Sequence, residues 1–518
     1  MLRAKRFNAL LYDASTHFGN RPFLLRDPIL GEVTYTEVFQ FANGLQRQFD
    51  ELGIEAGDSV ATLFHNSGMA ALLFLSIIAT RRVLVPLNPL YTAYELEYVL
   101  KRARCAAVIH DPADNKCANF NGRSSVAVTD HREYLSKTID NALKVDVSLE
   151  KLHCNDRLVG EIVFTSGSTG RPKGVVLSEE NVLANASSLA QVYQLCDTDR
   201  FLTVCPLFHN SGQVFTTLAC MLVGGSTVAI KSDIGMLHFW SYIDKYRPQW
   251  SFGMNSFLAL LLARPGGPRE PELMRGLLTG GSAIDGAVVE RFEARFQIPV
   301  RTVYGLTETS SISTCEYLDP NPRSSGSSGR PLPICDVKIQ SQHSSSERKE
   351  TGAYERGEIL IRGDNLFEGY VDDPELTKHR KSGGWLHTGD IGYFDHNGNL
   401  FVVDRVDSML IVGGENVYPA EVEILCPQLP GATQILLVGL KHDILGNELV
   451  LVYTADKDIS PSIDQWHRVL AENLVAAKLP QRYVAMGELG QSEFPKKENG
   501  KIDRQAVLSL VKKWARRC

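Results

Sequence analysis

Short runs of consecutive apolar residues alternate with longer amphipathic stretches over about the first 320 residues. Strands of this kind, without polar alternation, are buried on both faces, as in a parallel sheet that helices cover on both sides. The fold class predicted for this part is therefore α/β, with a large N-terminal domain built on parallel sheets. The predicted strands are 62–65, 83–86, 106–110, 159–164, 201–205, 227–230 and 300–304.

The pattern changes after residue 320. Residues 321–328 are rich in Ser, Pro and Gly, residues 340–351 are polar, and short strand-like runs follow at 358–362 and 400–403. These features predict a small β-rich subdomain at about 321–404, which completes a first domain over 1–404.

A smaller α+β domain is predicted over 405–518, and we expect it to move relative to the first. It contains strand-like runs at 435–438 and 448–453 and a helical stretch at 462–477. Ser460 and Pro461 stand before this stretch, as residues at a helix start often do.

Composition narrows the class of protein. The chain has 518 residues and a net charge of −6, which argues against nucleic acid as the main partner. Its ten cysteines form no C-x-x-C pair, so we expect reduced thiols in a cytoplasmic protein. The longest apolar run, 69–79, is too short to span a bilayer and is predicted to be a buried helix. Neither a secretory signal nor a membrane span is expected.

One glycine-rich segment, TSGSTGRPKG at 165–174, follows a predicted strand and precedes a helix expected near Glu179. Small residues let backbone N–H groups approach an anion, hydroxyls add donors, and Lys173 adds positive charge. Pro172 stands where a Walker A loop has glycine, which disfavours GTPases and P-loop kinases. A run of Gly and Ser alone is typical of a surface turn. The full string in this context favours phosphate binding.

The segment resembles the signature loop of the adenylate-forming superfamily, in its acyl-CoA synthetase or acid–thiol ligase branch. Other motifs that resemble this family follow in order as far as residue 504, whereas the first 150 residues carry none. They lie at 206–212 (PLFHNSG), 304–308 (YGLTE), 357–370, 384–390 (GWLHTGD), 404–405, 413–423 and 495–504. The resemblance implies that the chain activates a carboxylic acid with ATP as an acyl-adenylate, and then passes the acyl group to a thiol.

The resemblance also implies a nucleotide site. Tyr304 would stack on adenine, Thr307 would contact the α-phosphate, and Asp390 would accept hydrogen bonds from both ribose hydroxyls. Glu308 would bind Mg²⁺, which prefers oxygen ligands. The implied ATP and AMP contacts are Thr165, Ser166, Gly167, Ser168, Thr169, Gly170, Lys173, Gly280, Gly281, Ser282, Tyr304, Gly305, Thr307, Asp390 and Arg405.

Lys501 is the central catalytic candidate. A carboxylate and a phosphate repel each other by about 4 kcal/mol at 4 Å in a dielectric near 20. A cation between them would offset this repulsion and stabilise the transition state. A lysine after Asn-Gly is, by itself, typical of a solvated turn, and the flanking motif favours the catalytic role. The implied catalytic set is Lys501, Glu308, Thr307 and His209.

The resemblance implies that Asp407 is a hinge about which the C-terminal domain turns for the thiol step. Gly413, Gly414 and Glu415 would then line the path of the pantetheine arm, although a Gly-Gly pair is equally typical of a β-turn. His209 is a pocket wall or gate, or a buried core histidine. The implied acyl pocket comprises His209, Asn210, Met254 and Asn255.

Asn210 makes the expected pocket entrance polar, which favours an aryl or otherwise functionalised acid and leaves a medium-chain acid open. No aspartate stands where one would bind an α-amine, so an amino acid is disfavoured. The leading hypothesis is an acid–CoA ligase that uses ATP, Mg²⁺ and CoA. The alternatives are a stand-alone adenylation enzyme that loads a carrier-protein phosphopantetheine, and a non-catalytic nucleotide-binding relative, which Glu308 and Lys501 argue against.

Overall fold

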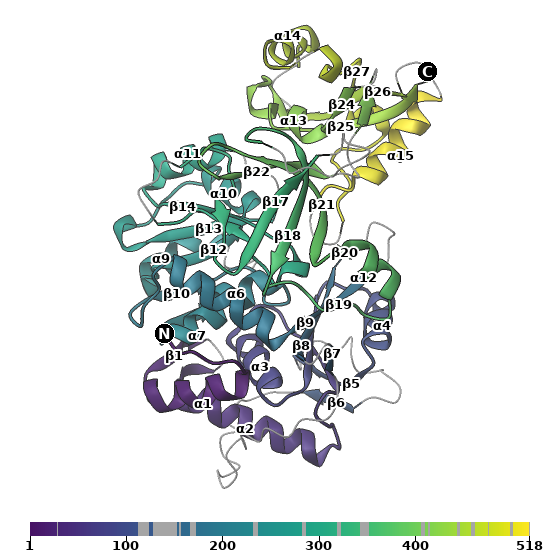
Figure 1. The fold of residues 1–518 in the computed structure, drawn as a ribbon. Coiled ribbons are helices and arrows are strands. Elements are labelled where there is room, and N and C mark those ends of the chain that lie inside the picture. Colours follow the sequence, from purple (N-terminus) through teal and green to yellow (C-terminus); the bar gives the residue numbers. More distant parts are fainter. Residues whose placement is uncertain are drawn as a thin grey trace. The chain divides into compact units, whose positions relative to one another are not determined.

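The computed structural model describes most of the chain as two compact units (Figure 1). The first unit holds Met1–Lys338, Leu360–Thr388 and Asp395–Leu400, and the second holds Ile339–Ile359, Gly389–Phe394 and Phe401–Cys518. The described residues are 1–27, 30–111, 124–127, 153–154, 157–165, 172–230, 237–281, 286–318, 323–341, 352–405, 410–412, 415–442, 446–456, 461–474, 476–497 and 501–516.

The described strands of the first unit form two large sheets. One has the order β19-β9-β8-β4-β3-β5-β6, with β7 paired to β8. Strands β8, β4, β3, β5 and β6 run parallel, and β9 and β19 follow antiparallel at one edge. The bounds are β3 Ser59–Leu63, β4 Val83–Leu87, β5 Cys105–His110, β6 Ser124–Ala127, β7 His153–Cys154, β8 Arg157–Thr165, β9 Lys173–Ser178 and β19 Gly369–Tyr370.

The helices beside this sheet follow from their sequences. In α3 (Gly68–Ala79) nearly every side chain is buried, as expected of a helix that is apolar all round, and Ser67 caps its N-terminus. Figure 1 shows it beside α1 (Phe7–Phe18) and α2 (Tyr35–Glu51), which both contact it. The predicted buried helix at 69–79 is confirmed. Helix α4 (Ala93–Arg102) joins β4 to β5.

The second sheet has the order β16-β15-β14-β13-β12-β10-β11-β1-β2 among the described strands, and its members from β14 to β1 are parallel. The predicted parallel α/β architecture is therefore confirmed. The bounds are β1 Pro22–Asp27, β2 Gly31–Thr34, β10 Arg200–Thr203, β11 Ser226–Ala229, β12 Trp250–Met254, β13 Gly276–Gly280, β14 Val300–Tyr304, β15 Thr314–Cys315 and β16 Arg330–Pro331.

Side chains from both faces of this sheet are buried. Leu202 packs with helices α9 (Phe239–Tyr246), α10 (Asn255–Leu262) and α11 (Gly286–Phe296). Its neighbour Phe201 points to the other face and meets Phe215 of the π-helix η2 (Gly212–Ala219). Helix α6 (Glu179–Val192) packs on η2, which continues into α7 (Cys220–Val223).

The helix expected near Glu179 is confirmed, since α6 begins at that residue. A strand that was not predicted, β9, lies between the glycine-rich segment and this helix and pairs antiparallel with β8, so that Lys173 stands opposite Thr165. The apolar side chains of Val175, Val176 and Leu177 are buried when β9 pairs with β8, and no helix N-terminus directly follows the segment.

A sheet with the order β17-β18-β21-β20, and β22 on β21, contains residues of both units. The strand-like runs at 358–362 and 400–403 lie within its strands β18 and β22. Helix α12 (Pro374–Arg380) stands before β20. The bounds are β17 Cys335–Gln340, β18 Gly357–Gly363, β20 Lys381–Ser382, β21 Trp385–Phe394 and β22 Leu400–Arg405.

The second unit is built on a sheet with the order β24-β23-β26-β25, to which β27 adds beside β26. Alternate residues of β25 and β26 enter two separate apolar cores, one containing Trp466 and the other Val507. The predicted helix at 462–477 ends early, at Asn473, because the chain turns extended at Leu474. The bounds are β23 Leu410–Val412, β24 Glu415–Val417, β25 Ala432–His442, β26 Gly446–Ala455, β27 Arg482–Ala485, α13 Pro419–Glu423, α14 Ile463–Asn473 and α15 Arg504–Ala515.

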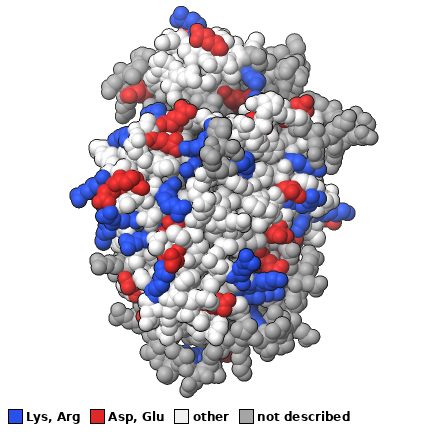
Figure 2. All heavy atoms as spheres, turned by 60° about the vertical axis from the view of Figure 1, so that its left-hand side comes forward, with Lys and Arg blue, Asp and Glu red and all other residues white. Residues whose placement is uncertain are grey.

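Charged side chains of both signs are interspersed on the face drawn in Figure 2. Ion pairs in the described part of the protein include Arg247 with Glu270 and Arg21 with Asp197. Among the helices that the structure describes, none combines the length and the apolar character needed to cross a bilayer.

Candidate active site

The carboxyl ends of β12, β13 and β14 bring several candidate residues to one edge of the second sheet. Met254 ends β12 and pairs with Gly280 at the end of β13, while Tyr304 ends the neighbouring β14. A Cβ on Gly280 would lie 2.6 Å from the carbonyl oxygen of Val303, so only glycine allows this approach. In open α/β sheets, ligands bind at this end of the strands. Asn255 follows Met254 and accepts a hydrogen bond from the Thr279 hydroxyl at 2.7 Å.

A tight turn follows β14 and carries Thr307 and Glu308. A Cβ on Gly305 would lie 1.8 Å from the carbonyl oxygen of Ser311, because the chain folds back on itself at this point. Thr307–Thr309 form one 3₁₀ turn, and the Thr309 hydroxyl accepts from the N–H of Leu306 at 3.0 Å. The turn therefore holds the Thr307 and Glu308 backbone rigidly at the sheet edge.

Glu308 is buried, and its carboxylate is oriented by Tyr370. The Tyr370 hydroxyl donates to Oε1 of Glu308 at 2.7 Å, and burial together with this carboxylate raises the pKa of Tyr370. The N–H of Phe367 donates to the Glu308 carbonyl at 2.9 Å. We assigned no role to Tyr370 from the sequence, although it stands in the 357–370 motif. Hydrogen-bonded partners of this kind orient metal-binding carboxylates.

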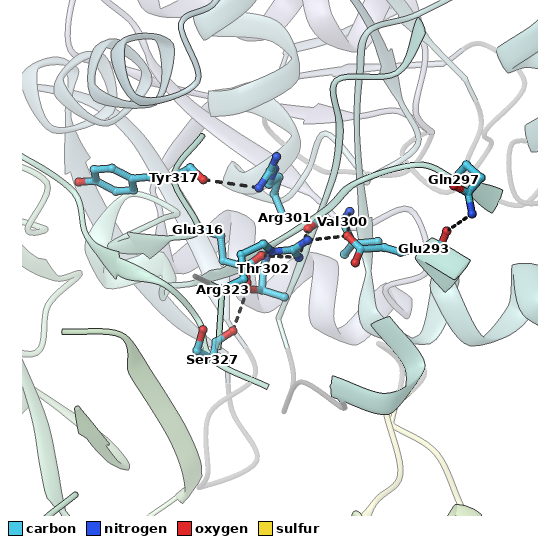
Figure 3. A network of polar contacts seen from close by, with 9 residues as sticks. All are labelled: Glu293, Gln297, Val300, Arg301, Thr302, Glu316, Tyr317, Arg323 and Ser327. Carbon is cyan, nitrogen blue, oxygen red and sulfur yellow. Dashed lines mark hydrogen bonds and ion pairs between the residues drawn. The ribbon is translucent and has the colours of Figure 1, made fainter. Parts of the chain in front are cut away.

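The base of β14 is held by Arg323, as Figure 3 shows. Its guanidinium lies 2.7 Å from Glu293 Oε1 and 2.9 Å from Glu316 Oε2, and it donates to the Val300 carbonyl at 2.5 Å. Glu316 in turn accepts from the N–H of Thr302 at 3.0 Å. This network fixes β14 five to eight residues before the turn that carries Glu308.

The PLFHNSG segment connects β10 to η2 and lies against the Thr307 turn. Asn210 is buried, and its Nδ2 donates to the Thr307 carbonyl at a long 3.5 Å. The ring centroids of His209 and Phe208 are 4.5 Å apart. The structure therefore brings the candidate acyl-pocket motif and the candidate metal motif together, although 97 residues separate Asn210 from Thr307.

In the second unit, Asp390, Arg405 and Lys501 lie close together. Asp390 on β21 is buried, and its Oδ1 is 3.0 Å from Nη1 of Arg405 at the end of β22. Lys501 remains exposed to solvent, yet partial burial of its ammonium group and then Arg405 lower its pKa, which Asp390 raises. The Lys501 carbonyl accepts from the N–H of Lys497 at 2.8 Å, next to an antiparallel bridge between Lys496 and Ile502.

Several predicted residues lie outside the described part of the chain. Thr165 and Lys173 are described at the ends of the β8–β9 hairpin, and Gly281 is described after β13. Glu415 is described only through its backbone, which pairs with Val412. The remaining candidates fall outside the description, and they are Ser166, Gly167, Ser168, Thr169, Gly170, Ser282, Asp407, Gly413 and Gly414.

No group of three His, Cys, Asp or Glu side chains gathers as a metal cluster within the described ranges. Mg²⁺ is commonly bound by one or two carboxylates together with substrate phosphates and water. The buried, tyrosine-held carboxylate of Glu308 fits that mode of binding, in which the nucleotide supplies further ligands.

Open parallel sheets often bind ligands at the carboxyl ends of their strands, where these candidate residues lie. Comparison of the sequence with known protein families identifies the family. The chain belongs to the AMP-binding enzymes, whose family model matches residues 12–371. Among its relatives are an oxalate–CoA ligase of Arabidopsis thaliana, 28% identical over 89% of this chain and 90% of that protein, and a 2-succinylbenzoate–CoA ligase of Geobacillus kaustophilus, 29% identical over 93% of each.

Solved structures share the fold over almost the whole chain. ATP-bound MatB from Rhodopseudomonas palustris has a TM-score of 0.86 at 23% identity and covers 98% of both chains. MenE, the o-succinylbenzoate CoA synthetase of Bacillus subtilis in complex with its acyl-adenylate OSB-AMP, has a TM-score of 0.83 at 24% identity and covers 96% of this chain and 97% of its own.

Proposed function

We propose that this AMP-binding enzyme is an ATP-dependent acid–CoA ligase. The carboxylate oxygen of the acid attacks the α-phosphorus of ATP and pyrophosphate leaves. The thiol sulfur of CoA then attacks the acyl carbon, AMP leaves with the electron pair of the broken bond, and the thiol proton is released. The observation that carries the proposal is the gathering of Asp390, Arg405 and Lys501, which come from three separate motifs.

These three residues suit the adenylation step. Asp390 is a buried acceptor for ribose hydroxyls, and Arg405 supplies donors beside it. Lys501 adds a mobile cation that can lie between the acid and the α-phosphate, where it offsets the repulsion between two anions. The partial desolvation that lowers the pKa of Lys501 also leaves less hydration to be lost when the ammonium group binds the two anions.

The first unit carries further residues that we propose as nucleotide ligands. Tyr304 and the Gly280–Gly281 backbone would flank adenine, and the hairpin that begins at Thr165 and returns at Lys173 would hold the phosphates. Glu308, oriented by Tyr370, would hold Mg²⁺. When bound, Mg²⁺ supplies positive charge to the phosphates that separate as pyrophosphate.

The acid is proposed to enter beside His209, Asn210, Met254 and Asn255. The buried amide of Asn210 gives this pocket a polar entrance. The proposed substrate is therefore an aryl or functionalised acid rather than a plain alkyl acid. The oxalate–CoA and 2-succinylbenzoate–CoA ligases among its relatives support this choice, whereas another relative is a long-chain-fatty-acid–CoA ligase.

Substitution Lys501→Ala tests the assignment of the catalytic lysine. We expect acid-dependent ATP–pyrophosphate exchange to be nearly abolished, while ATP binding, measured by calorimetry, remains. Lys512→Ala removes an exposed lysine from α15 of the same unit and serves as the matched control. Exchange at the wild-type rate in Lys501→Ala would remove Lys501 from its proposed role.

The thiol acceptor is tested by following consumption of a preformed adenylate. We propose CoA as the acceptor, bound along Gly413, Gly414 and Glu415 after a rotation about Asp407. A carrier-protein phosphopantetheine is the alternative, because both thiols end in the same arm. Rapid consumption with CoA is the expected result, whereas indifference to CoA and reaction with a carrier protein would establish the alternative.

A further inference from the structure

Glu161 lies in the middle of β8, fully enclosed by the first unit. It is 0% exposed, and its strand neighbours across the sheet are Leu84 on β4 and Leu177 on β9. Neither carboxyl oxygen accepts a hydrogen bond from the described part of the protein. A buried carboxylate without donors is strongly destabilising, so the ionised form of this side chain does not fit its surroundings.

Gln213 of the π-helix η2 is the polar side chain next to Glu161. Gln213 is also 0% exposed, and its Nε2 donates to the Leu207 carbonyl at 2.8 Å. Its Oε1 is buried and has no donor among the described residues. An amide oxygen and an ionised carboxylate can each only accept, and both of these groups lack a donor among the described residues. One proton on Glu161 would satisfy both groups.

We infer that Glu161 is a neutral carboxylic acid in the folded protein, that its O–H donates to Oε1 of Gln213, and that this pair positions the acyl-pocket segment through Leu207. The inference rests on the proposed function for the role of that segment. The neutral state of Glu161 does not depend on the proposed function, because it follows from the burial of the two side chains and from their oxygens without donors.

No charged group near Glu161 among the described residues stabilises its ionised form, so the neutral carboxylic acid is favoured. Burial is the largest influence on Glu161 and raises its pKa to about 8. An N–H of Gln213 directed at the carboxylate would lower this pKa, but neither carboxyl oxygen has a hydrogen-bond partner among the described residues. Strand β4 and helix η2 carry no titratable side chain, and β9 carries only Lys173, at its far end opposite Thr165. Strand β7 carries His153 and Cys154, whose backbones pair with Leu158 and Arg157.

Helix α6 contributes Glu179, which lies against Gly160, but its carboxylate accepts from the N–H of Phe7 at 2.7 Å. None of these charged groups acts on Glu161 appreciably, since its pKa responds to burial and Gln213 alone.

The link to the acyl pocket runs through the backbone of Leu207. Its carbonyl accepts from Gln213, and its N–H donates to Oδ1 of Asn66 at 3.0 Å. The Asn66 amide also donates to the carbonyls of Thr203 and Ile230 at 3.0 Å each. Leu207 is thus held on both sides by buried amide groups, two residues before His209. Helix η2, an eight-residue π-helix, presents Gln213 to the Leu207 carbonyl.

Kinetics of three variants test the positioning role, with benzoate, 2-succinylbenzoate, oxalate and octanoate as probe acids in pyrophosphate exchange. Glu161→Leu and Gln213→Leu each leave a buried polar group without its partner. We expect the KM for the best probe acid to rise by about tenfold in both, while the KM for ATP is unchanged. Glu161→Gln keeps a donor for Gln213, so its KM should remain near that of the wild type. Equal changes in both KM values in the Leu variants would indicate general loosening and overturn the positioning role.

Infrared difference spectroscopy tests the proton independently of activity. The spectrum of wild type minus Glu161→Gln should show a neutral carboxylic C=O band at pH 7 that vanishes well above pH 8, near the pKa of this group. Asp395→Asn is the matched control, because Asp395 is also buried, yet hydrogen bonds from Asn399 and Ser324 outweigh burial and lower its pKa, so its removal should show no neutral band at pH 7. A carboxylate band at pH 7 in its place would overturn the inference. If no probe acid supports exchange but the neutral band is present, the proposed substrate class fails while the shared proton stands.

Discussion

Replacement of Glu161 by glutamine should stabilise the first unit progressively as pH rises. The folded protein holds a proton on Glu161 at pH values where the unfolded chain has released it, because the pKa rises from 4.5 to about 8 on folding. Stability in the wild type must therefore fall with increasing pH between these two values. Glutamine has the same shape and no proton to lose, so this part of the pH dependence disappears in Glu161→Gln.

The size of the effect follows from the same two values. Each unit of pKa corresponds to about 1.4 kcal/mol, so the interval from 4.5 to about 8 corresponds to roughly 5 kcal/mol. The variant should gain about 1.4 kcal/mol on the wild type for each pH unit within this interval, and the gain should level off above it. Below pH 4.5 the Glu161 carboxyl is protonated in both the folded and the unfolded protein. The difference in stability between the variant and the wild type is therefore constant there.

Hydrogen exchange followed by mass spectrometry is the appropriate assay. A chain of this size does not unfold in one step, so the opening free energy of the amides in β8 and β4 is a better measure than a global transition. These strands flank Glu161 directly. Opening free energies that run parallel in wild type and Glu161→Gln from pH 5 to pH 8 would refute the neutral carboxyl. Amides in the second unit provide an internal control, since they should not respond.

Further predictions concern the site and its support. Tyr370→Phe removes the donor to Glu308 and should weaken Mg²⁺ binding by about 10- to 100-fold in the metal dependence of pyrophosphate exchange; an unchanged dependence would contradict the orienting role. Asp390→Asn removes a group that raises the pKa of Lys501, so the alkaline limb of kcat should move to lower pH, and a shift to higher pH would exclude this coupling. Arg323→Met leaves Glu316 buried without its cation and should cost roughly 1–3 kcal/mol, seen as a lower Tm that Glu316→Gln partly restores. Asp407→Pro should slow thioester formation more than adenylation, and equal losses would argue against a hinge.

Local sequence was sufficient for the chemistry-bearing motifs and for many of the strands, although β1, β12 and β13 were not predicted. Unbroken apolar runs can be buried only where both faces of a strand are covered, so they identified the parallel sheets directly. The structure after Thr165 was harder to predict, because the apolar residues 175–177 form a run that is too short for its periodicity to distinguish a strand from a helix. Only pairing with β8 decided that they form a strand.

Contacts between distant motifs were decided by tertiary structure. The sequence identified Glu308 and Lys501 as candidates, but the hydrogen bond from Tyr370 and the approach of Arg405 and Asp390 depend on which strands become neighbours. The unpaired carboxyl of Glu161 carried no local signal at all, because a single acid in an apolar strand could equally face solvent at an edge. Burial and the loss of competing water determine its charge, and these are properties of the packed sheet rather than of the residue.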